Sequence, residues 1–180
     1  MASFEDSQID YKSLKKVTGK TADFSSLAET CVAFANAQGG DVVIGIEDKE
    51  AAPDKSQRIS IDVMNKTVAR LRDLTDAVGI VNPEIVTHQN GGQYFKFSIF
   101  PTTRTIATTS SGKVFVRITD NSVPVSGEEL TNLAAEKNAF QWELVSVGKV
   151  TLQQADINEV TYFAEQIQES KLVSDFIKEK

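Results

Sequence analysis

The chain has 180 residues, 41% of them hydrophobic, and a formal net charge of −6. This length and composition predict one ordinary globular domain with a core of its own. No run of about 18 apolar residues occurs, which excludes a membrane-spanning helix. The acidic charge argues against a protein that coats nucleic acid through bulk electrostatics. However, the net charge is −5 from residue 128 onward and only −1 before it, which leaves room for a local basic face.

The N-terminal residues and the single cysteine bear on location. The first residues are polar and acidic, unlike a secretory signal peptide. Cys31 has no second cysteine with which to form an internal disulfide. The sequence therefore predicts a cytoplasmic protein with no membrane partner.

The first predicted element is a strand over residues 8–14, in which apolar and polar residues alternate. Ile9 and Tyr11 share one face, and Asp10 and Lys12 share the other, polar face. This alternation is typical of a half-buried strand.

A helix over residues 24–38 follows, with Asp23 as its N-cap and Cys31 on its apolar stripe. Gly39 stands where a left-handed helix end is expected. We favour this interpretation over a phosphate-binding loop, because such a loop precedes a helix. The continuous apolar run over residues 41–46 predicts a buried strand.

The later elements are one helix, two hairpins and a further helix. Ser60 can cap a helix over residues 61–77. An Asn-Gly turn joins two strands in residues 83–101, and a second hairpin is expected in residues 103–119. A capping box that begins at Ser126 predicts the next helix.

This element order predicts the α+β class, with a mixed, largely antiparallel sheet, helices packed on it and a helical C-terminal extension. We expect two parts, a domain over residues 1–142 and a helical connector over residues 143–180. The chain stops inside an amphipathic segment. We therefore expect the connector to lead to downstream domains of a longer protein.

Three carboxylates form the first candidate site. Glu5 precedes the first strand, Asp10 lies on it, and Asp48 follows the buried strand. If the two strands are neighbours, the three groups converge and suit Mg²⁺ or Mn²⁺, with Lys12 close enough to neutralise a phosphate. The alternative is that these are ordinary surface acids in weak ion pairs with nearby lysines.

The second candidate site is a basic sheet face. Lys96, Arg104, Lys113 and Arg117 are expected on strands, with Tyr94 beside Lys96. Cations interleaved with an aromatic ring grip a nucleic-acid backbone. The alternative is a solvated face with cross-strand pairs.

Four segments together resemble a known family, the Schlafen-type AlbA-like domain: "EDSQIDYK", "VAFANAQGGDVVIGIED", "VFVRITDNSVPVS" and "EEL...WE". The resemblance covers residues 5 to 142. It implies a compact α+β fold that interacts with nucleic acid, in bacterial and archaeal members described as transcriptional regulators. The tail over residues 143–180 is similar to the connector that leads to further domains in bacterial members.

The resemblance also implies roles for single residues. In some Schlafen proteins three carboxylates form a metal-dependent site that cleaves RNA, and Glu5, Asp10 and Asp48 match them. Arg117 matches the arginine of a family strand. Asp10 is one methylene shorter than the usual glutamate, and the loop after Asp48 lacks the expected glycine. These departures weigh against catalysis.

Three hypotheses follow. The first is a non-enzymatic nucleic-acid-binding module, for DNA or RNA, in transcription regulation. The second is an endoribonuclease with Mg²⁺ or Mn²⁺ as its cofactor. The third is a protein-interaction or homo-oligomerisation module that uses the C-terminal helices.

Overall fold

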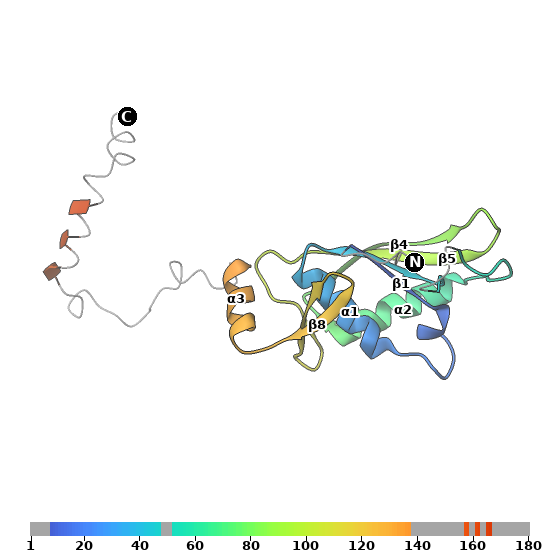
Figure 1. The fold of residues 1–180 in the computed structure, drawn as a ribbon, viewed down its shortest axis with the longest axis horizontal. Helices are drawn as coiled ribbons and strands as arrows, with labels where there is room; N and C mark the ends of the chain where they lie inside the picture. The colour runs from blue at the N-terminus through green and yellow to red at the C-terminus, as the bar shows by residue number, and fades with distance from the viewer. Residues whose placement is uncertain (1–7, 48–51, 138–156, 159–160, 163–164, 167–180) are drawn as a thin grey trace, which may run out of the picture. The chain divides into compact units, whose positions relative to one another are not determined.

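The computed structural model describes residues 8–47, 52–137, 157–158, 161–162 and 165–166. Figure 1 shows the ribbon. The chain divides into two units, residues 1–140 and 141–180, and each is described by itself. In the first unit, helices pack on a mixed sheet, which confirms the predicted α+β class.

The main sheet has four strands in the order β1 (Ile9–Lys12), β2 (Gly40–Ile44), β5 (Gln93–Phe100) and β4 (Gly79–Thr87). β1 runs parallel to β2, and the other neighbours are antiparallel. The predicted hairpin in residues 83–101 is confirmed as β4 and β5. Val42, Val43 and Ile44 are all buried, as the apolar run of β2 predicts.

Helices α1 (Phe24–Asn36) and α2 (Ile61–Leu74) lie on one side of this sheet (Figure 1). Both predicted N-caps are confirmed, because the Asp23 and Ser60 side chains accept hydrogen bonds from backbone N–H groups of the first turn. A short 3-10 helix, η1 (Leu14–Lys16), precedes α1. We call the face of the sheet toward α1 and α2 the inner face, and the opposite face the outer face.

The core lies between the inner face and the two helices. Alternate residues of β5 point into it, as predicted, and they belong to one core cluster with side chains of both helices. The largest fully buried apolar side chains are Phe34, Phe95, Phe97, Leu27, Ile44, Leu71 and Ile99. Burial raises the pKa of the Cys31 thiol, which fits the core position expected for a residue on that stripe of α1.

The predicted second hairpin is wrong in its pairing. β6 (Thr108–Thr109) pairs with β3 (Thr75–Asp76), so α2 ends at Leu74, before its predicted end. The Asn36 side chain bonds both the N–H and the carbonyl of Ala107, so that backbone is satisfied without a strand partner. β7 (Val114–Ile118) instead pairs with β8 (Asn121–Val125), a strand that the sequence analysis missed.

The last helix of the first unit is α3 (Glu128–Glu136). The predicted capping box does not form. Gly127 is the N-cap, with φ of +59°, and no side chain caps the helix. In the second unit residues 157–158, 161–162 and 165–166 are helical, and Ile157 and Tyr162 are exposed. Among the residues that the structure describes, no helix is long and apolar enough to cross a membrane.

Candidate functional site

The strands that were predicted to bring the carboxylates together are neighbours. In the parallel pairing of β1 with β2, Asp10 lies beside Val42. The ends of the two strands meet, because the Ser13 hydroxyl donates a 2.7 Å hydrogen bond to the Glu47 carboxylate. Glu5 and Asp48 lie outside the described residues, so the three-carboxylate site stays a prediction.

Asp10 was expected on a solvated polar face, and this expectation is wrong. Its register with Val42 turns it to the inner face, where the residue is 1% exposed. Its Oδ1 accepts a 2.8 Å hydrogen bond from Lys12 Nζ and lies 3.5 Å from Nη2 of Arg117. A buried carboxylate needs such partners because desolvation of an unpaired charge is costly.

Arg117 lies in the interior, with its side chain only 2% exposed. Its guanidinium carbon is 4.8 Å from the centroid of the Phe34 ring, a cation–π contact. A Cβ at Gly40 would come within 2.6 Å of that same ring. Gly40, Phe34, Arg117 and Asp10 therefore form one stack, in which the side chains of the last three are buried, and the stack joins β1, β2, α1 and β7.

Asn36 is a second buried link that the sequence analysis missed. Its amide nitrogen donates to the carbonyl oxygens of Ala107 and Phe115, and its oxygen accepts from the Ala107 N–H. Each of these partners is more than 70 residues away along the chain. Asn36 thus fixes the end of α1 against β7 and the loop that precedes β6.

Lys137 contacts the same end of α1. Its buried ammonium donates hydrogen bonds to the carbonyl oxygens of Ala35 and Thr102, and burial lowers its pKa. A cation is favoured at this position because the C-terminus of a helix carries a partial negative charge. The "AFAN" segment is therefore explained by packing and helix-end chemistry.

The outer face carries the predicted pair Tyr94 and Lys96. Their neighbours Ser98 and Phe100 alternate with the core residues of β5 and point the same way. Lys96 Nζ lies 2.9 Å from the Glu84 carboxylate on β4, and this pair raises the pKa of Lys96. The Lys96 side chain is 40% exposed, so it is open to a ligand that competes with Glu84.

The other predicted basic residues do not join Lys96. Arg104 is exposed in the loop between β5 and β6, not on a strand. Lys113 is exposed just before β7, in a small pocket that Glu29 of α1 also lines. α1 packs on the inner face, so Lys113 and Lys96 lie on different sides of the main sheet. With Arg117 in the interior, the four residues do not form one basic face.

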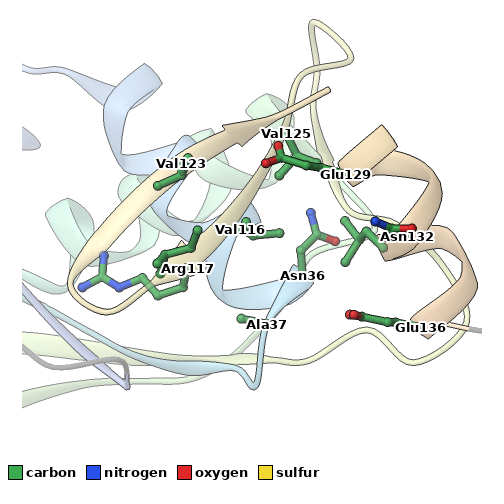
Figure 2. A pocket seen from close by; sticks show the side chains of 11 residues that line it. Asn36, Ala37, Val116, Arg117, Val123, Val125, Glu129, Asn132 and Glu136 are labelled. Atoms are coloured by element: carbon green, nitrogen blue, oxygen red, sulfur yellow. The ribbon is translucent and has the colours of Figure 1, made fainter. Parts of the chain in front are cut away.

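A pocket of about 360 Å³ lies between the end of α1, the β7–β8 hairpin and α3 (Figure 2). Figure 2 shows Glu129, Asn132 and Glu136 of α3 around it, while the Arg117 side chain leads away from it. Val116 and Val123 of the hairpin supply apolar walls. Carboxylates beside apolar walls repel a phosphate, so this pocket does not suit a nucleic-acid backbone.

The described residues by themselves do not form a metal site. No group of three His, Cys, Asp or Glu residues suited to a metal occurs within residues 8–47, 52–137 and the short described helical stretches. Asp10 supplies one suitable atom, because its buried Oδ2 has no hydrogen-bond partner among the described residues. The donor set therefore fits a hard cation only if Glu5 and Asp48 complete it.

The sequence of the chain matches a known family. The chain matches the family described as Schlafen, AlbA_2 over residues 5–126, and it belongs to that family. Membership makes it a nucleic-acid-related domain. The crystal structure of the DIP2311 protein from Corynebacterium diphtheriae is similar at 20% sequence identity, with a TM-score of 0.45. The similarity covers 66% of this chain and 22% of that one. No curated protein matches the chain significantly.

Proposed function

We propose that this domain binds nucleic acid through the outer face of its four-stranded sheet. The observation that carries the proposal is the outward row of β5: Tyr94, Lys96, Ser98 and Phe100. Alternate residues of a strand are about 6.8 Å apart, so aromatic, cationic and hydroxyl groups follow one another along the middle of the face. Aromatic rings beside a cation favour single strands, whose unpaired bases can stack on them.

The charges on this face predict weak, salt-sensitive binding. Lys96 is accompanied by the carboxylates of Glu84 and Asp41, both of which raise its pKa. A phosphate must therefore displace Glu84 before it can pair with Lys96. Each neutralised phosphate contributes a slope of about −0.7 to the dependence of log K on log[salt] for single strands. We expect a slope that corresponds to one or two phosphates.

Fluorescence anisotropy with labelled single-stranded DNA and RNA tests the proposal. Glu84→Gln should raise the affinity about threefold, because it releases Lys96 and removes a negative charge. Asp73→Asn, a change of the same charge on the exposed side of α2, is the control and should leave binding unchanged. Equal effects of the two variants, or no binding at any salt concentration, would contradict the proposal.

Within a longer protein we propose a regulatory role for this module. Residues 143–180 would connect it to downstream domains, and the whole protein would act on nucleic acid in the cytoplasm, in transcription control. The family match and the outer face support a nucleic-acid role. Sequencing of DNA and RNA that co-purify with the full-length protein would distinguish DNA targets near promoters from RNA targets.

A metal-dependent endoribonuclease is the second candidate function. Asp10 favours it, because its Oδ2 has no hydrogen-bond partner among the described residues and its Oδ1 is paired with Lys12 and Arg117. Mg²⁺ or Mn²⁺ would supply charge stabilisation at the scissile phosphate. Incubation of transfer RNA with Mn²⁺ should then give cleavage that Asp48→Ala abolishes. Cleavage that survives both Asp48→Ala and Glu5→Gln would exclude this site.

A protein-interaction role is the third candidate, favoured by the exposed Ile157 and Tyr162. The apolar stripe predicted over residues 157–167 would pack against a partner. Sedimentation of the full chain should show self-association that Ile157→Ser weakens. A monomer at every concentration would exclude homo-oligomerisation.

A further inference from the structure

We propose that a pocket at one end of the outer face binds a guanine base of single-stranded nucleic acid. This inference rests on the proposed nucleic-acid function and adds the base that is recognised. The pocket has a volume of about 370 Å³, within the range of small-ligand sites. It lies where β1, β2 and β5 meet the turn after α1. The lining side chains that matter are Gln38, Asp41, Ser98 and Phe100.

Asp41 is the residue that would determine base specificity. It lies on β2 directly opposite Ser98 of β5, whose hydroxyl donates a 2.6 Å hydrogen bond to Asp41 Oδ1. Within the described part of the chain no cation forms a salt bridge with Asp41, and its Oδ2 has no hydrogen-bond partner. The half-buried carboxylate is therefore oriented by Ser98, and its Oδ2 can accept hydrogen bonds from a ligand.

The chemistry of the bases makes this carboxylate selective. An ionised carboxylate only accepts hydrogen bonds. Guanine carries two adjacent donors on its Watson–Crick edge, N1–H and N2–H₂, which match two carboxylate oxygens. Adenine and cytosine present one donor beside an acceptor, and the N–H of uracil or thymine lies between two carbonyl oxygens. Each of these edges places an acceptor against Asp41, so guanine is favoured.

Phe100 supplies a surface for stacking. It is 57% exposed, belongs to the outward row of β5 and lines the same pocket. A flat aromatic side chain left in water contributes little to the core, but it can stack on any base. The exposed amide of Gln38 lies on the rim, where it can donate to the guanine carbonyl. The pocket thus offers stacking, a donor and a paired acceptor.

Binding of short oligonucleotides tests the inference. The probes are nine-residue uridine and thymidine strands whose central position is guanine, inosine, adenine or the parent base. Inosine lacks the N2 amino group but keeps the ring. The wild-type chain should bind the guanine strand about tenfold more tightly than the inosine strand, since one bidentate base contact gives discrimination of this order.

Variants separate recognition from stacking. Asp41→Asn keeps an oxygen that accepts from Ser98, but it places an amide donor where the second carboxylate oxygen was. The preference for the guanine strand should therefore vanish, and the affinity for the adenine strand should rise. Phe100→Ala should weaken binding of all strands by about tenfold. The matched controls are Asp62→Asn and Ile61→Ala on α2, where both side chains are exposed. Neither control should change binding.

The outcomes are distinguishable. Binding of all strands with equal affinity by the wild-type chain would overturn the guanine inference and leave the proposed function intact. A guanine preference that persists in Asp41→Asn would overturn the role of Asp41, and with it the inference. Absence of binding to every strand would overturn the proposed function as well.

Discussion

At the scale of single residues, the two ends of α1 show different chemistry. Asp23 caps the N-terminus, and the Ser26 backbone N–H that it binds lowers the pKa of its carboxyl group. At the other end, the amide of Asn36 donates to the distant Ala107 carbonyl, and the ammonium of Lys137 donates to the Ala35 carbonyl of α1 itself. Both ends are therefore fixed by specific polar side chains, as the unpaired backbone groups of helix termini require.

Asp23→Ala should lower the free energy of unfolding by about 1 kcal/mol at neutral pH, because the cap is lost. Asp23→Asn keeps an accepting oxygen and should lower the free energy of unfolding by less. A carboxyl group whose pKa is lower in the folded than in the unfolded state stabilises the folded protein at pH values above the unfolded pKa of about 3.9. This stabilisation is lost as the pH falls through the folded pKa. Urea unfolding between pH 3 and pH 7 should therefore show a steeper acid loss for wild type than for Asp23→Asn. Parallel curves would contradict this role.

The residue scale also shows which features the sequence could predict. Asp23 and Ser60 were predictable because their partners lie three residues away. The roles of Asn36 and Lys137 were not, because their partners lie as far as 102 residues away in the chain. For Asp10, the alternation along β1 was read correctly, but only the pairing with β2 reveals which face is buried.

At the scale of elements, the stack of Gly40, Phe34, Arg117 and Asp10 joins three layers of structure. β2 approaches α1 closely because Gly40 has no side chain. The Phe34 ring then fills that space, and the Arg117 guanidinium lies over it. This contact positions β7, and through β7 the whole β7–β8 hairpin.

Gly40→Ala should destabilise the fold by about 2 kcal/mol, the usual cost of overpacking. A Cβ there would come within 2.6 Å of both the Gln8 carbonyl oxygen and the Phe34 ring. Gly79→Ala is the control, since its Cβ would meet only the Phe100 Cβ, at 3.8 Å. Thermal unfolding of the two variants should differ clearly. Similar losses in both would show that the space at Gly40 is not required.

Arg117→Met should lower the free energy of unfolding by about 3 kcal/mol, because Lys12 would then be the one remaining partner of buried Asp10 among the described residues. Asp10→Asn should lower the free energy of unfolding by a similar amount. If the pair acts as a unit, the double variant should lose less than the sum of the single losses. Denaturant unfolding of the four proteins measures this coupling. Strictly additive losses would show that Asp10 and Arg117 act independently.

The pairing of elements was harder to predict than their existence. The helices and the β4–β5 hairpin were predictable from periodicity and the Asn-Gly turn. β8 was missed because Pro124 interrupts its pattern, and proline is tolerated there since β8 is the edge of a two-stranded sheet. The short β3–β6 pair depends on contacts that no local pattern encodes.

At the scale of the whole molecule, the net charge of −6 sets the character of the proposed interface. Bulk electrostatics do not favour nucleic acid, so a local set of aromatic and cationic groups must supply the affinity. The four predicted basic residues do not gather on one face; only Lys96 lies in the outward row of β5. The family was predictable from its motifs, whereas the location of the interface required the sheet register.

Comparison of Lys96→Ala with Lys66→Ala tests the central claim most directly. Both lysines form one ion pair with a neighbouring carboxylate, but Lys96 lies on the outer face and Lys66 on α2. The measurement is the affinity for a labelled single-stranded oligonucleotide between 50 and 200 mM salt, a range over which phosphate contacts weaken. We predict that Lys96→Ala weakens binding severalfold and flattens the salt dependence, while Lys66→Ala changes neither. Equal effects, or a larger effect of Lys66→Ala, would contradict an interface on the outer face.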